Sequence, residues 1–180
     1  QVLPHFWLYS ALAAPFLLVA RWAGAHELSA FTWANVALLA IAARFAAGRF
    51  RPATLVFLFL GPILWWVDKA HTEVFAYSIL VVIVSQHTAR PAVSVLAGGL
   101  LAAQHPQALL FFAGVWTWMV RRSIARVTDA RLPAAAALAS LACALSYGGY
   151  YLWRIGRWTP LPESGDLRIP AVRTAGAILW

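Results

Sequence analysis

Long apolar runs follow one another along the whole chain, and short loops between them carry most of the charge. Hydrophobic residues make up 62% of the 180 residues and charged residues only 11%. A soluble domain has about a quarter of its residues charged, and a core cannot hide so much apolar surface. The composition therefore predicts an integral membrane protein, with the lipid bilayer as its main partner.

The lengths of the runs predict membrane-spanning helices. A hydrocarbon layer about 30 Å thick needs roughly 20 helical residues, and backbone in lipid must form its own hydrogen bonds. We expect one all-α domain, a polytopic transmembrane helix bundle with about seven spans and the start of an eighth near Ala171. The expected spans are Pro4–Trp22, Ala30–Ala47, Pro52–Val67, Lys69–Gln86, Pro91–Ala103, Pro106–Val120 and Pro133–Trp153.

Proline supports these boundaries, because it is well tolerated in the first turn of a helix. Pro15 and Pro62 lie inside spans and should kink them. The spans on either side of Gln104-His105-Pro106 are short, so they form either two thin helices or a re-entrant pair. The only methionine is Met119, and the chain stops within an apolar run, which indicates an internal piece of a longer protein.

Arginine predicts the orientation. It is concentrated in loops that lie on one side of the membrane if every span crosses, and such loops are usually cytoplasmic. The net charge of +8 is therefore interpreted as a topology signal and a source of phosphate contacts, with no nucleic acid as partner. The opposite side receives Glu27, residues 68–73, Gln104-His105 and the loop that begins at Arg154.

The stretch WWVDKAHTE places Asp68, Lys69, His71 and Glu73 between two apolar runs. One interpretation is a tight turn in which Asp68 caps the next helix and Lys69 pairs with Glu73 one turn later. The alternative is functional: Asp68, His71 and Thr72 would share one helix face, where carboxylate and imidazole exchange protons or hold sugar hydroxyls. A divalent metal is possible from the ligand types, but their spacing matches no known motif.

Other polar residues are expected on the same side. Gln104 and His105 end one span, and His105 is either a turn residue before proline or part of a site. Tyr150, Tyr151, Arg154 and Arg157 end the span that begins at Pro133. These arginines either extend toward the interface or bind phosphate. Three separate loops therefore converge on one membrane face.

The order of these segments resembles the multispan glycosyltransferases of the GT-C class, especially bacterial mannosyl- and aminoarabinose-type transferases. The resemblance rests on HFWLYSALAAPFLL, DKAHTEVFAYSILVV, LAAQHPQALLFF and GGYYLWRIGRWTPL, and it covers nearly the whole chain as a pattern. It implies transfer of a sugar from a polyprenyl-phosphate donor to an acceptor at the periplasmic face of the bacterial inner membrane. It also implies a catalytic acid upstream of residue 1.

The resemblance gives each polar residue a role. His71 and Glu73 would contact donor or acceptor, Lys69, Arg154 and Arg157 would contact phosphate, and the remaining residues would line the substrate site: Asp68, Gln104, His105 and Tyr151. Two other classes stay open, a lipid or solute transporter and a non-catalytic membrane subunit. The spans contain almost no charge at mid-depth, where coupling residues of transporters normally lie.

Overall fold

The computed structural model describes residues 7–105, 108, 113–114, 117–118, 121 and 131–155, and the regular elements of this part of the chain are all helical. The chain divides into two compact units, Gln1–Tyr147 and Gly148–Trp180. The elements are α1 (Trp7–Trp22), α2 (Ser29–Ala46), α3 (Pro52–Phe59), the 3₁₀ helix η1 (Pro62–Trp66), α4 (Glu73–Gln86), α5 (Pro91–Gln104) and α7 (Arg131–Ile155). The expected all-α class is confirmed for the described residues.

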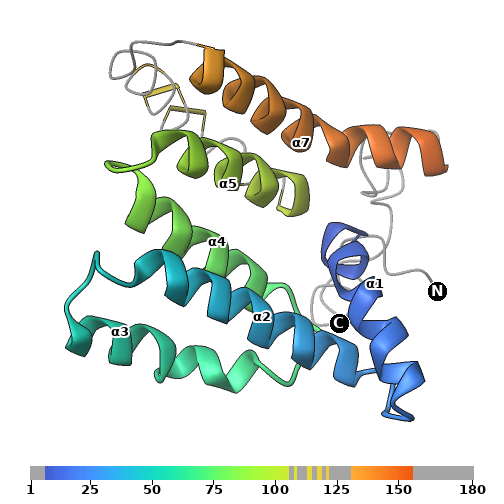
Figure 1. Ribbon diagram of the computed structural model, residues 1–180. Helices are drawn as coiled ribbons and strands as arrows, with labels where there is room; N and C mark the ends of the chain where they lie inside the picture. Colours follow the sequence, from blue (N-terminus) through green and yellow to red (C-terminus); the bar gives the residue numbers. More distant parts are fainter. Residues whose placement is uncertain are drawn as a thin grey trace, which may run out of the picture. The chain divides into compact units, whose positions relative to one another are not determined.

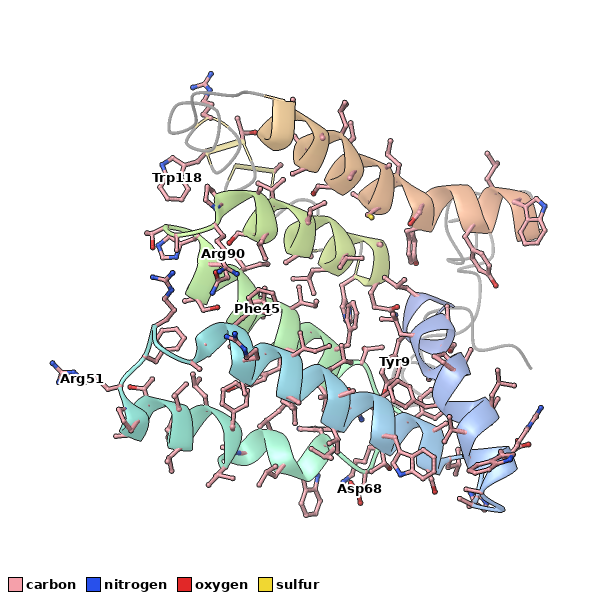
Figure 2. The ribbon with its side chains drawn as sticks, in the orientation of Figure 1. Tyr9, Phe45, Arg51, Asp68, Arg90 and Trp118 are labelled. Atoms are coloured by element: carbon pink, nitrogen blue, oxygen red, sulfur yellow. The ribbon has the colours of Figure 1, made fainter. Side chains whose placement is uncertain are left out.

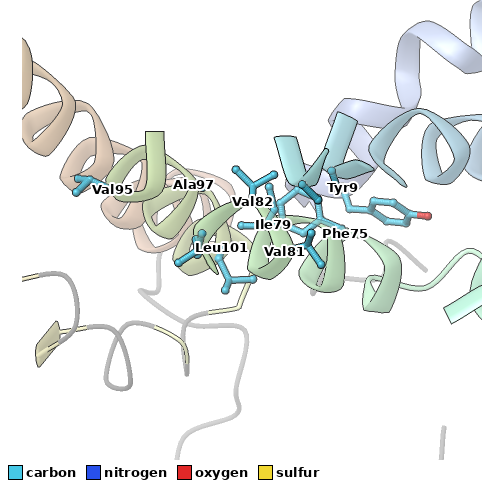
Figure 3. Packing of buried hydrophobic residues seen from close by; sticks show 11 residues of the cluster. Tyr9, Phe75, Ile79, Val81, Val82, Val95, Ala97 and Leu101 are labelled. Atoms are coloured by element: carbon cyan, nitrogen blue, oxygen red, sulfur yellow. The ribbon is translucent and has the colours of Figure 1, made fainter. Parts of the chain in front are cut away.

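Helix α4 is the centre of the first unit. It packs against α2 on one side and α5 on the other, while α3 lies beside α2 (Figure 1). The apolar core joins side chains of α4 to those of α2, α5 and α1 (Figure 3), and its members are Tyr9, Ala42, Ala46, Phe75, Ile79, Val81, Val82, Ile83, Val95, Ala97 and Leu101.

In α2 the size of the side chains changes from the buried face to the exposed face. The buried residues of α2 are small or amide-bearing: Ala30, Ala34, Asn35, Ala42 and Ala46. Large aliphatic side chains of the same helix, Val36 and Ile41, are both 53% exposed. Helix α3 buries none of its residues. This arrangement is the reverse of a soluble amphipathic helix, which points its large apolar side chains inward.

The stretch from residue 52 to residue 72 differs from the expected spans. The predicted span Pro52–Val67 is interrupted, because α3 ends at Phe59 and η1 begins at Pro62. The interruption expected at Pro62 is confirmed, since proline lacks an N–H and its ring clashes with the preceding turn. The predicted start of the next helix at Lys69 is wrong: residues 67–72 form turns, and α4 begins at Glu73. Helix α1, in contrast, continues through Pro15.

Helix α1 does not run alongside its neighbours. Tyr9 near its start bonds to Gln104 at the end of α5, and Arg21 near its end pairs with Glu27 just before α2. The end of α5 and the start of α2 lie at the same end of the unit, so α1 is inclined across that end (Figure 1).

By length and composition, α2 is the one helix of the described part that could cross a membrane, with 18 residues. The apolar stretches of the other helices there have 10–17 residues, among them residues Ala134–Tyr150 within the longer α7. Most of the expected span Pro106–Val120, and the expected span near Ala171, lie outside the described residues.

Candidate functional site

One group of polar residues of the first unit gathers where α2 and α4 begin and α5 ends. We call this the polar end, and it consists of Tyr9, Asn35, residues 66–73, Gln104 and His105. The sequence predicted that residues 68–73 and Gln104-His105 would lie together. The hydrogen bonds described next connect both groups through Tyr9 and Asn35.

Asn35 holds the polar end together. Its side chain is fully buried, and its amide nitrogen donates to the carbonyl oxygens of Val67 at 3.0 Å and Lys69 at 3.1 Å. Its amide oxygen accepts from the Tyr9 hydroxyl at 2.7 Å. A buried amide is costly without partners, so these bonds fix the loop that carries the charged residues.

Gln104 connects α5 to α1. Its amide oxygen accepts from the Tyr9 backbone N–H at 2.9 Å. That N–H belongs to the first turn of α1, where backbone donors have no partner within the helix. The predicted site residue Gln104 is 2% exposed. It is therefore a structural contact of α1 in this arrangement.

The predicted capping role of Asp68 is wrong. The residue at the N-cap position of α4 is Thr72, and no side chain caps this helix. Asp68 instead points outward (Figure 2) and its carboxylate pairs with Lys69, Nζ to Oδ1, at 3.3 Å. Lys69 also donates to the Trp65 carbonyl and lies 4.2 Å above the Trp65 ring. The expected pair of Lys69 with Glu73 is replaced by these contacts within the loop.

His71 and Glu73 do lie side by side, although not as predicted. The expected helix face shared by Asp68, His71 and Thr72 does not form, because all three precede α4. The His71 Nδ1 atom is 3.8 Å from Glu73 Oε2, and both side chains are about half exposed. The His71 ring also stands edge-on to the Trp66 ring, with centroids 5.6 Å apart. This imidazole and carboxylate are open to a ligand.

His105 completes this group from the side of α5. Burial lowers the pKa of His105 below its ordinary value, and the Glu73 carboxylate acts in the opposite sense. The two residues are thus close enough to interact electrostatically. The Nε2 atom of His105 is buried and has no hydrogen-bond partner in the described part of the chain. Burial therefore favours the neutral imidazole.

An apolar groove begins at Glu73. It has a volume of about 380 Å³ and runs between α4 and the α3–η1 segment. Its walls are aromatic and aliphatic, and Glu73 is the only acidic residue among them. The lining residues are Phe57, Leu58, Pro62, Ile63, Trp66, Glu73 and Tyr77. Ligand sites commonly combine such apolar walls with a few polar groups that fix orientation.

The remaining predicted residues are not brought into this group. Arg157 lies outside the described residues, and the side chains of Tyr151 and Arg154 also lie outside what the structure describes. The possible metal site has no support in residues 7–105 or the other described positions. No three His, Cys, Asp or Glu side chains gather there in a way that could hold an ion.

Sequence reasoning missed Tyr9 and Asn35. A signal for Asn35 was present, since it is an amide within an apolar run and a buried amide needs partners. No comparable signal identified Tyr9, because its role depends on the inclination of α1. The comparisons with family models, with curated proteins and with solved structures find no match to this chain.

Proposed function

We propose that this chain is part of a polytopic membrane glycosyltransferase of the GT-C class, with about seven spans. It would move a sugar from a polyprenyl-phosphate donor to an acceptor at the periplasmic face of a bacterial inner membrane. The observation that carries the proposal is the meeting of an apolar groove with an open carboxylate and imidazole at Glu73 and His71.

The membrane assignment is supported by the size of the side chains. Large residues on the outside of the helices are freely exposed, for example Leu18 at 68%, Phe57 at 70% and Leu138 at 68%. Soluble proteins rarely expose large contiguous apolar patches, whereas lipid tails accept such residues. Helices in membranes also pack closely through small residues, and Ala34, Gly99 and Ser140 lie in such contacts.

The short helices favour a site at the depth of the lipid phosphates. At 1.5 Å per residue, the 14 residues of α4 extend about 21 Å. This is less than the roughly 30 Å of hydrocarbon, and a short helix draws the bilayer surface toward its ends. Residues 66–73 would then meet the phosphate of a lipid-linked sugar at the headgroup level.

The residues in and beside the groove divide into three binding roles, for the tail, the sugar and the phosphate of the donor. A prenyl tail suits the walls formed by Phe57, Leu58 and Tyr77. The Glu73 carboxylate accepts hydrogen bonds from sugar hydroxyls, with His71 beside it. Lys69 would bind the phosphate in place of the Asp68 carboxylate. Its ion pair with Asp68 is weak, because the Asp68 side chain is 76% exposed.

Photolabelling tests this proposal. Polyprenyl-phosphate mannose with a diazirine on its tail would be irradiated with the full protein in proteoliposomes. We expect labelled peptides that contain Phe57, Leu58 or Tyr77. Glu73→Gln should reduce labelling at least fivefold, because the amide loses the acceptor strength of a carboxylate for sugar hydroxyls.

Glu27→Gln is the matched control, since it removes the same charge from an exposed carboxylate outside the groove, paired with Arg21. It should leave labelling unchanged. Equal loss in both variants, or labels spread over all lipid-facing helices, would contradict the proposal. Transfer of labelled mannose from the donor to a membrane extract, lost in Glu73→Gln alone, would support the enzymatic step.

A further inference from the structure

A second pocket lies at the opposite end of the first unit, where α2 and α4 end and α5 begins. Its volume is about 320 Å³, and three of its residues are arginines. The lining residues are Arg44, Phe45, Ala47, Arg49, Gln86 and Arg90. We call it the arginine pocket. It is separate from the groove at Glu73, because the two share no residue.

The backbone around the arginine pocket is fixed by turns and by a buried amide. Gln86 is 3% exposed, and its side-chain nitrogen donates to the Phe45 carbonyl at 2.8 Å. This bond ties the end of α4 to the end of α2. Gly48 then turns the chain with a φ of 77°, which brings Arg49 back to the same pocket. Arg90 directly precedes Pro91, the first residue of α5.

The three guanidinium groups have no opposite charge from the described residues. None of them forms an ion pair with a carboxylate there. The sequence explains this, because neither residues 28–67 nor residues 74–128 contain any Asp or Glu. Guanidinium groups stay charged at every physiological pH. Three positive charges around one pocket are therefore not neutralised by this part of the chain, and they are available to an anion from outside it.

We propose that the arginine pocket binds a phosphate group. Guanidinium matches phosphate because its N–H donors form paired, charge-assisted hydrogen bonds with the phosphate oxygens. The volume of the pocket suits one phosphate with part of its substituent. The phosphate comes from an anionic lipid headgroup or from a small water-soluble phosphate compound. The proposal does not depend on glycosyl transfer at the opposite end.

A preference of arginine for the cytoplasmic side would also explain why arginines gather at one end of the unit. That preference depends only on how many arginines lie there, whereas phosphate binding depends on which of them line the pocket. Arg51 separates the two explanations. It lies in the same region as the first residue before α3, it is exposed, and it does not line the pocket. Figure 2 shows Arg51 pointing away from the protein, whereas Arg90 and Phe45 line the same pocket. Arg51→Gln thus removes the same charge without changing the pocket.

The experiment measures binding to the full protein in nanodiscs of neutral phosphatidylcholine. One arm adds inorganic phosphate, and the other replaces part of the lipid with phosphatidylglycerol; thermal unfolding followed by tryptophan fluorescence reports both. We expect stabilisation in at least one arm. Arg44→Gln, Arg49→Gln and Arg90→Gln should each weaken binding about tenfold or more, in line with the loss of charge-assisted hydrogen bonds. Arg51→Gln should weaken it less than about twofold, as expected for an exposed charge.

The two arms identify the source of the phosphate. Stabilisation by phosphatidylglycerol alone supports a lipid headgroup, and stabilisation by inorganic phosphate supports a soluble ligand. The proposal is overturned if neither arm stabilises the protein, or if Arg51→Gln weakens binding as much as Arg90→Gln. Unfolding temperatures without added inorganic phosphate or phosphatidylglycerol should be the same in all four variants, because these side chains are exposed.

Discussion

Asn35 determines how the charged loop is presented. Its side chain reaches two loop carbonyls and the Tyr9 hydroxyl, so three segments distant in sequence depend on one amide. Residues 67–72 could not hold their positions alone, because this loop has no regular hydrogen-bonding pattern. The exposed His71–Glu73 pair is therefore supported from a buried residue on another helix.

Replacing Asn35 with leucine should destabilise the protein by about 2–3 kcal/mol, because it leaves several buried or half-buried polar groups without partners. Tyr9→Phe removes one of these bonds and should cost only about 1 kcal/mol. Denaturant unfolding in detergent measures both values. Limited proteolysis should also show faster cleavage within residues 67–72 in Asn35→Leu. Equal costs in the two variants would mean that the amide does not hold the loop.

The partly buried imidazole of His105 predicts a dependence of stability on pH. Its pKa is lowered by burial in the folded state, while the unfolded chain has the ordinary value of about 6.5. The unfolded state therefore binds a proton first as the pH falls, and stability decreases from about pH 6.5 down to the folded pKa. The contribution of neutral His105 to stability is fully present above about pH 6.5.

Two measurements test this behaviour of His105. The NMR titration of its ring protons should have a midpoint below that of a model peptide. Glu73→Gln should lower the midpoint further, because the carboxylate that raises this pKa is gone. The stability of His105→Gln should fall less than that of the unmodified protein between pH 6.5 and pH 5. A midpoint at or above 6.5 in the unmodified protein would contradict the expected burial.

The helix bounds were predictable where proline or a run of arginine-rich loop residues marks them. The expected Ala30–Ala47 corresponds to α2 at Ser29–Ala46, and the expected Pro91–Ala103 to α5 at Pro91–Gln104. Pro62 marked the interruption of its span, but the turns of residues 67–72 were not predictable in the same way. Apolar composition continues through Leu64 and Trp65, so hydropathy gives no sign that the helix has ended. The bonds of Asn35 hold the loop at Val67 and Lys69, and sequence spacing does not encode them.

The close contact of α5 with α7 predicts opposite effects for two adjacent glycines. A Cβ atom at Gly99 would lie 2.4 Å from the Ser140 carbonyl oxygen, whereas a Cβ at Gly98 would meet nothing within 4 Å. Gly99→Ala should destabilise by about 1–3 kcal/mol through overpacking. It also threatens the bond from the Ser140 hydroxyl to the Val95 carbonyl.

Gly98→Ala is the control for this contact between helices. Alanine forms helix better than glycine by about 1 kcal/mol, so this variant should be unchanged or more stable. Unfolding temperatures in the same detergent compare the two. If Gly98→Ala were the more damaging variant, the face of α5 that meets α7 would be different from the one described.

At the scale of the whole molecule, the two ends of the first unit differ in charge chemistry. The polar end carries Asp68, His71 and Glu73, and the other end carries Arg44, Arg49 and Arg90. The sequence predicted this separation from the loops and the ends of the spans, because most of the charge lies there. It did not predict the groove or the arginine pocket, since both depend on how α2, α3 and α4 pack.

Cysteine labelling tests whether these two ends face opposite sides of a membrane. In a Cys143→Ala background, Ala70→Cys places a single exposed thiol at the polar end. Ala89→Cys places one at the opposite end, next to the arginine pocket. An impermeant maleimide added to spheroplasts should label Ala70→Cys, and Ala89→Cys should react only after the membrane is opened. The short α4 must then thin the bilayer around it. Labelling of both thiols from one side would mean that α4 does not cross, and the separation of a sugar site from a phosphate pocket by the membrane would be lost.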